Sequence, residues 1–144
     1  MYKIIVASLL GALAFPVLAQ MTPVGVWRTF DEKTGEVKSE VRIVDNAGVL
    51  SGKIEKLLAK DAKQDDVCDK CKDARKDKPI MGMEIIRGAK KADDKNIWED
   101  GKILDPENGK EYTLRLTPKD DGKKLEVRGY IGFFYRNQAW VRVQ

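Results

Sequence analysis

Apolar and polar residues alternate with a period of two in a series of short runs between residue 24 and the carboxyl terminus. Successive side chains of a β-strand point to opposite faces, so this alternation predicts strands with one buried and one solvated face. With a first run at 24–30 and a short run near 97–104, about eight strands are expected. The remaining runs are 37–43, 50–55, 81–85, 112–117, 125–128 and 138–143.

Turn-forming residues fill the gaps between these runs, at 33–35, 45–48, 105–109 and 119–122. Each gap contains Asn, Asp or Gly, the residues that tolerate a positive φ. Many short strands with hairpin-length connections fit either a sandwich or a closed barrel. We favour the barrel, because closure removes exposed sheet edges. The sequence therefore predicts an all-β fold, an antiparallel barrel of about eight strands.

Residues 58–79 break the alternation, because they are rich in Asp and Lys and poor in apolar residues. They predict a long polar loop with room for one or two helical turns. The loop contains the pair Cys68 and Cys71. A haem attachment site would need histidine where Lys72 stands, and a structural zinc site would need two further ligands. A local disulfide formed after export is favoured, with thiol-redox activity or metal binding as alternatives.

The amino terminus has the layout of a secretory signal peptide. Lys3 precedes an apolar run at 4–18, and Ala19 provides a small residue before Gln20. Cleavage between Ala19 and Gln20 would leave a barrel domain of residues 20–144 in the periplasm or outside the cell. The run of about fifteen apolar residues is shorter than the ~20 that span a bilayer, so no membrane span is expected.

Composition argues against several activities. The chain contains no histidine, which removes the commonest general base and a common zinc ligand. Glu99 and Asp105 could act as a pair of carboxylates, but Asp105 is equally explained as a turn residue. The formal charge of +4 is small and the charges are interspersed, which does not indicate nucleic-acid binding. We expect a protein that is not an enzyme and that holds no cofactor or metal.

Gly25 and Trp27 open the first predicted strand, and Arg142 lies on the last. This arrangement resembles the closed-end signature of lipocalins and other calycins. The resemblance implies that the tryptophan plugs the barrel floor and that the guanidinium stacks on its ring. The alternative is an ordinary buried tryptophan in a β-sandwich.

A wider resemblance covers essentially the whole chain after the leader. The motifs at 25–28, 50–54, 78–83, 98–112 and 125–132 resemble those of the small exported bacterial proteins known as domain of unknown function 2147. The resemblance implies a lipocalin-like barrel and a periplasmic or secreted location. It brings no established reaction, and therefore no catalytic residues to transfer.

The alternation also predicts a binding pocket. If Arg142 points inward, Trp140 does too, because residues two apart on a strand share a face. We expect a small apolar or lipid-like ligand at the end of the barrel away from Trp27. The alternatives are a filled barrel with a structural or protein-interaction role and, third, a thiol-redox protein acting through Cys68 and Cys71. The expected lining is Val41, Ile43, Met83, Ile85, Tyr112, Leu114 and Trp140.

An aromatic run at 131–135 follows the seventh predicted strand. Alternation places half of it in the core and the other half at the barrel rim, where an apolar patch often marks ligand entry or a protein contact. A homodimer through Phe133, Phe134 and Tyr135 is therefore a further expectation.

Overall fold

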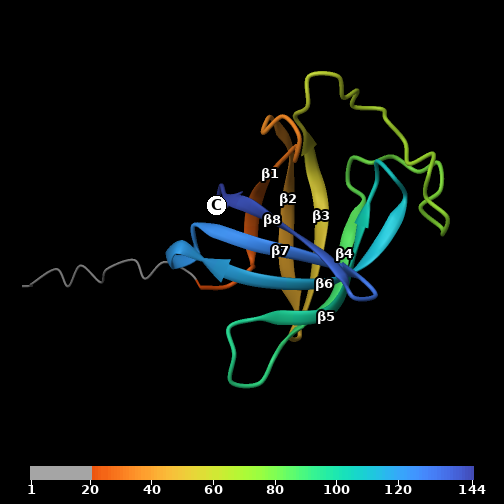
Figure 1. Ribbon diagram of the computed structural model, residues 1–144. Helices are drawn as coiled ribbons and strands as arrows, with labels where there is room; N and C mark the ends of the chain where they lie inside the picture. The colour runs from red at the N-terminus through yellow and green to blue at the C-terminus, as the bar shows by residue number, and fades with distance from the viewer. Residues whose placement is uncertain (1–20) are drawn as a thin grey trace, which may run out of the picture.

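The computed structural model describes residues 21–144, and the predicted leader with its cleavage site lies outside this part. Eight strands form a closed barrel in which each strand pairs antiparallel with the next, as Figure 1 shows. The predicted all-β barrel is confirmed. No helix in residues 21–144 is long and apolar enough to cross a membrane. The strands are β1 (Gly25–Phe30), β2 (Val37–Asn46), β3 (Val49–Leu57), β4 (Glu84–Lys91), β5 (Trp98–Asp105), β6 (Lys110–Lys119), β7 (Lys124–Ile131) and β8 (Phe134–Arg142).

The barrel closes where β1 pairs with β8, with Trp27 opposite Arg142. Trp27 is fully buried, and its indole Nε1 donates a hydrogen bond of 2.7 Å to the Pro23 carbonyl. The Arg142 guanidinium lies 4.3 Å from the Trp27 ring centroid. The contact implied by the resemblance to calycins is therefore present at this end of the barrel.

Arg142 also joins three chain segments through their carbonyl oxygens. It donates hydrogen bonds to Thr22 at 2.6 Å, to Val24 at 2.8 Å and to Gly122 at 2.6 Å. Gly122 belongs to the 3₁₀ turn η1 (Asp120–Gly122) between β6 and β7. Gly25 has a φ of +142°, and a Cβ there would lie 2.4 Å from the Gln144 carbonyl oxygen. The glycine of the Gly-x-Trp motif is thus required by the close packing of the start of β1 against Gln144.

The inward faces of the strands form one continuous core. Each large aliphatic side chain that becomes fully buried contributes about 1.5–3 kcal/mol to stability, so this core supplies most of the driving force for folding. The fully buried large side chains include Ile43, Leu50, Ile86, Leu114, Leu116 and Leu125.

A long excursion, residues 58–83, connects β3 to β4 and extends from one end of the barrel (Figure 1). It contains no helix, although Val67 and Pro79 form an isolated antiparallel bridge. The expected strand at 81–85 is wrong in its start, because β4 begins at Glu84. Met83 instead ends the excursion, where its carbonyl accepts a hydrogen bond from the Ile54 backbone N–H.

Candidate functional site

A cavity of about 280 Å³ occupies the end of the barrel opposite Trp27. All eight strands contribute to its wall, together with the excursion and the β1–β2 and β5–β6 turns. The volume lies close to the lower end of the ~300–1,000 Å³ range of small-molecule sites. The arrangement is therefore that of a cup, closed by Trp27 and Arg142 at its base.

The inner part of the cavity is apolar. Its buried lining side chains come from strands on every side of the barrel, so an apolar ligand would exchange water for hydrocarbon contacts. The apolar lining includes Val41, Ile54, Ile85, Leu104, Val127 and Trp140, with the half-buried Leu57, Ile80 and Ile103 nearer the mouth.

A buried hydroxyl pair interrupts this apolar wall. The Oγ1 atom of Thr29 and the Oγ atom of Ser39 lie 2.6 Å apart, and both residues line the cavity. On another part of the wall, the Tyr112 hydroxyl accepts a 3.0 Å hydrogen bond from the Asn108 side-chain amide. These groups can orient the polar end of a ligand, the usual role of the few polar groups in such sites.

Charged side chains surround the mouth. Gln138 accepts a hydrogen bond of 3.1 Å from the Trp140 indole and donates one of 2.7 Å to Glu32. The Glu32 carboxylate also pairs with Arg136 at 3.1 Å. Lys38 on β2 pairs at 3.0 Å with Glu107 in the β5–β6 turn. Polar bonds therefore join the β1–β2 turn to β8 and β2 to the β5–β6 turn.

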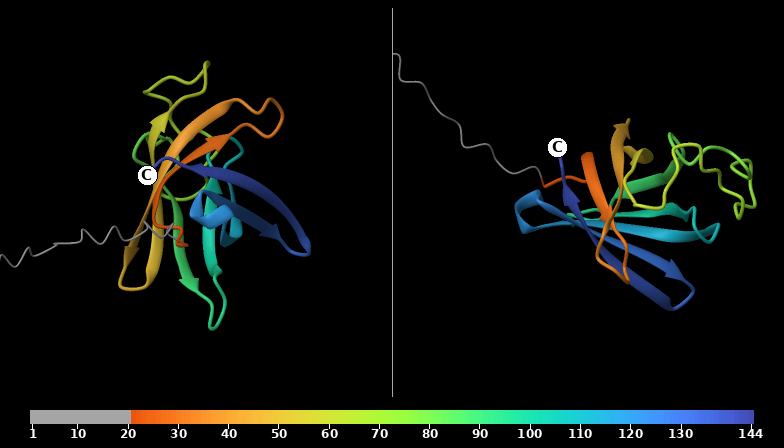
Figure 2. Two further views of the ribbon diagram at one scale, coloured as in Figure 1. Left: turned by 90° about the vertical axis from the view of Figure 1, so that its left-hand side faces the viewer. Right: turned by 90° about the horizontal axis from the view of Figure 1, so that it is seen from above.

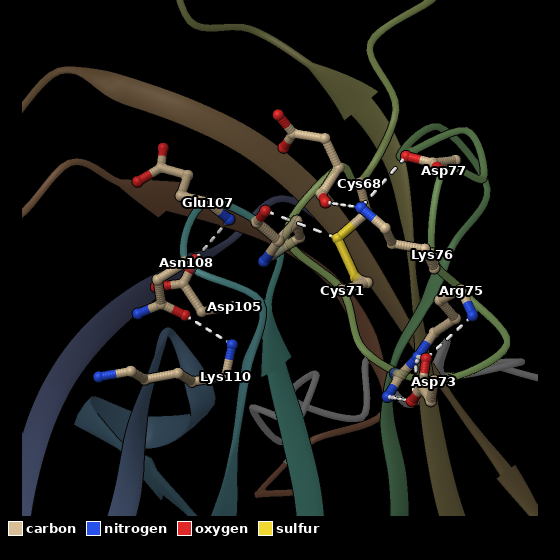
Figure 3. The surroundings of a disulfide bond; sticks show 12 residues. Cys68, Cys71, Asp73, Arg75, Lys76, Asp77, Asp105, Glu107, Asn108 and Lys110 are labelled. Atoms are coloured by element: carbon tan, nitrogen blue, oxygen red, sulfur yellow. Dashed lines mark hydrogen bonds and ion pairs between the residues drawn. A yellow bond between two sulfur atoms is a disulfide. The ribbon is translucent and has the colours of Figure 1, made fainter.

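Cys68 and Cys71 form a disulfide, and Figure 3 shows this bond beside Asp105, Glu107 and Asn108 of the β5–β6 connection. Both cysteines are buried, at 0% and 2% exposure. The Cys68 sulfur lies 3.7 Å from the Pro106 carbonyl oxygen, and Pro106 lines the cavity. Gly109 has a φ of +72°, and a Cβ there would lie 1.9 Å from the Lys70 carbonyl oxygen. The excursion thus packs closely on the β5–β6 turn.

A cluster of ion pairs links Arg75 of the excursion to strands β4 and β6 of the barrel. Arg75 contacts Asp73 at 2.5 Å and Glu111 on β6 at 2.8 Å, and Glu111 also pairs with Arg87 on β4. Hydrogen bonds from the Arg75 side chain and backbone lower the pKa of Asp73 to about 2. Burial raises the pKa of Glu111, but its bonds to the two arginines outweigh this and leave the pKa below its ordinary value.

The structure brings four of the seven predicted pocket residues together around the cavity, namely Val41, Ile85, Tyr112 and Trp140. The other three are buried elsewhere in the core and are not part of the lining. Ile43 pairs with Gly25 at the closed end, and Leu114 lies one inward position deeper than Tyr112. Met83 lies just before β4, where the excursion ends.

Other sequence candidates are separated or already engaged. Glu99 and Asp105 lie at opposite ends of β5, six residues or roughly 20 Å apart, and Glu99 pairs with Arg115. They therefore do not form a catalytic carboxylate pair. Within residues 21–144, no group of three or more Cys, Asp or Glu side chains is placed to hold a metal ion. Phe133, Phe134 and Tyr135 are exposed at the β7–β8 hairpin.

The predicted lining included the Tyr112 hydroxyl but not the hydroxyl pair of Thr29 and Ser39. Thr29 and Ser39 lie at inward-facing positions of β1 and β2. The alternation of these two strands could therefore have placed both side chains inside the barrel. Nothing in the local pattern indicates that Ala59, Ala62 and Ile80 of the excursion reach the mouth, because a long loop has no periodicity from which to read its path.

Comparisons with known proteins agree with this geometry. Residues 25–142 match the family model described as "Uncharacterized protein conserved in bacteria (DUF2147)". Protein HP1028 from the human pathogen Helicobacter pylori, described as belonging to the lipocalin family, has a similar solved structure. It superposes with a TM-score of 0.73 at 16% identity, covering 87% of this chain and 85% of that one. No curated protein matches the sequence.

Proposed function

Because this chain belongs to the bacterial family DUF2147 and folds as a lipocalin-like barrel, we propose that it binds one small, mainly apolar molecule in the cavity at its open end. The observation that carries the proposal is the cavity itself, a cup of about 280 Å³ with an apolar inner part, a charged mouth and walls from all eight strands. A water molecule takes up about 30 Å³ of liquid, so the cavity has room for a ligand of roughly ten non-hydrogen atoms.

The polar groups suggest how such a ligand is oriented. Thr29, Ser39 and Tyr112 present hydroxyl groups to a largely apolar wall, so a ligand with one hydroxyl or carboxyl group and a hydrocarbon or aromatic body fits this site. The Trp140 indole also lines the cavity, so a bound ligand should change the fluorescence of this one of the three tryptophans.

The test is a titration with medium-chain fatty acids and small aromatic acids, followed by tryptophan emission. We expect saturable binding that Val127→Phe weakens by an order of magnitude, because the larger ring occupies part of the cavity. Trp98→Phe is the matched control, since Trp98 is buried at the start of β5 and does not line the cavity. A titration without saturation at high micromolar concentration, or equal affinity in the Val127 variant, would refute the proposal.

We place this activity in the bacterial cell envelope or outside the cell. The apolar run at 4–18 and the following Ala19 support export, and a disulfide is in keeping with an oxidising compartment. The intact mass of protein recovered from a periplasmic fraction tests this, because the mature chain should begin at Gln20. Native mass spectrometry of the same sample would show whether a small molecule copurifies.

A redox role for Cys68 and Cys71 has less support. Thiol–disulfide exchange needs access of an attacking thiolate to a sulfur atom. Both cysteines are buried against the β5–β6 turn, which favours a structural role for the bond.

A further inference from the structure

The tip of the β7–β8 hairpin exposes an apolar surface that the cavity does not use. Phe133 and Phe134 are 101% and 83% exposed, the highest values among the large apolar side chains of residues 21–144. Ile131 and Tyr135 beside them are about half exposed. Figure 2 shows this hairpin extending away from the body of the barrel. Contiguous apolar surface on a protruding loop marks an interaction site.

Polarity changes stepwise along the hairpin. The outermost strand pair is Ile131 with Phe134, and the next is Tyr130 with Tyr135. The Tyr130 and Tyr135 ring centroids are 5.6 Å apart, and the Arg128 guanidinium lies 4.3 Å from the Tyr135 ring. Moving inward from the tip, the order is therefore apolar, then amphipathic aromatic, then cationic.

We propose that this tip inserts into the interfacial region of an anionic lipid surface. The three strand positions from Ile131 back to Arg128 span roughly 10 Å, which matches the ~5–10 Å to which interfacial apolar faces are buried. Phenylalanine at the tip would enter the acyl boundary, and tyrosine is enriched at headgroup depth. Arg128 would then lie at the level of the lipid phosphates.

The charge of the hairpin suits an anionic surface. The chain contains no Asp or Glu after Glu126, whereas Arg128 and Arg136 both lie within three strand positions of the tip. Glu32 of the β1–β2 turn pairs with Arg136, and Glu126 lies 3.6 Å from Arg128, so each arginine is partly neutralised. The attraction is therefore modest, and the apolar tip supplies most of the affinity. This inference stands on the hairpin alone and does not depend on a ligand in the cavity.

A second copy of the chain fits this surface less well. A fully exposed aromatic side chain offers roughly 150–250 Å², and two of the four side chains at the tip are only about half exposed, so the tip presents on the order of 500 Å². A specific protein interface buries about 800 Å² on each partner. Two convex tips related by a two-fold axis also meet over a small area, whereas a lipid surface adapts to the shape of a tip.

The experiment is flotation of the protein with vesicles of phosphatidylethanolamine and phosphatidylglycerol, compared with phosphatidylcholine vesicles. We expect binding to the anionic vesicles and a loss of about tenfold or more in Phe133→Ser/Phe134→Ser. Val44→Ser is the matched control, because Val44 is an exposed apolar residue on β2 away from the tip. The control should bind as the unaltered protein does.

A second variant tests insertion without removing the apolar surface. Phe133→Trp places an indole at the tip, and we expect its emission to shift to the blue on anionic vesicles and to be quenched by brominated lipid chains. Val44→Trp should show neither change. The proposal is overturned if the unaltered protein floats with neither vesicle. It is also overturned if sedimentation equilibrium shows a dimer that Phe133→Ser/Phe134→Ser dissociates, because the occupant would then be a second copy.

Discussion

Replacing Arg142 by alanine should destabilise the barrel more than the loss of any exposed arginine. The side chain stacks on Trp27 and donates to the carbonyls of Thr22, Val24 and Gly122. A cation–π contact contributes about 0.5–2 kcal/mol, and a hydrogen bond from a charged group about 1.5–3 kcal/mol. These terms are not additive, because water can reach some of the carbonyls once the side chain is removed.

The expected loss in the free energy of unfolding is about 3–5 kcal/mol, which is below the sum of these terms and is the size of loss expected when a hydrogen-bond network is broken. The free energy of unfolding of a small domain is about 5–15 kcal/mol in total, so the variant should remain folded but lose much of its stability. For a barrel of this length the melting temperature should fall by on the order of 10–20 °C. Arg142→Lys should recover less than half of the lost stability, because the lysine ammonium lacks the planar guanidinium that stacks on Trp27 and donates to several carbonyls at once.

Urea unfolding followed by tryptophan emission measures this change, with Arg42→Ala as the control. Arg42 lies on the outer face of β2, where it pairs with Glu55 and is largely exposed. Such a surface pair contributes no more than about 1 kcal/mol. If the two alanine variants lose equal stability, Arg142 is not the residue that holds the barrel ends together, and the reasoning above fails.

Three further predictions concern the excursion. Joint replacement of Cys68 and Cys71 by alanine should lower the free energy of unfolding by about 2 kcal/mol, as the chain-entropy model gives for so short a loop. Thermal unfolding under non-reducing conditions measures this change, and a loss above about 4 kcal/mol would contradict a purely local constraint. Gly109→Ala should free the excursion from the β5–β6 turn and speed its cleavage by protease, whereas unchanged cleavage would contradict close packing there. Because the pKa of Asp73 is lowered to about 2, its contribution to stability should be present above about pH 4 and lost as the pH falls towards 2. In Arg75→Gln, the free energy of unfolding should depend less on pH over that interval.

The strands were predictable because each hairpin is a local unit. Alternation and a turn residue suffice to indicate that β2 and β3, or β6 and β7, are strands joined by short connections. The contact between Trp27 and Arg142 was also accessible, because a closed barrel must pair its first strand with its last. The strand assignments and the closure use only sequence order and parity, whereas the stacking of Arg142 on Trp27 was implied by the resemblance to calycins.

Irregular pairing explains much of what the sequence could not indicate. The β3–β4 register shifts twice, and the adjacent residues Ile85 and Ile86 are both buried, which simple alternation forbids. Parity also cannot report depth along the barrel axis. Ile43 and Leu114 face inward as expected, but they lie too near the closed end to reach the cavity.

The cavity itself follows from the size of the inward side chains at each level of the barrel. An eight-stranded barrel is just wide enough for side chains to fill. The closed end contains Trp27, Leu116 and Leu125, whereas the level of the cavity includes Ser39 and Gly129. A sealed apolar cavity of about 280 Å³ would cost on the order of 7 kcal/mol at ~24 cal/mol per Å³, a large share of the stability of a small domain. Because the mouth is open to solvent, water can enter the cavity, and much of that cost is removed. A ligand that displaces this water would bury the apolar wall and gain the corresponding free energy. The small residues Ser39 and Gly129 in the wall of the cavity therefore support the binding site that we propose.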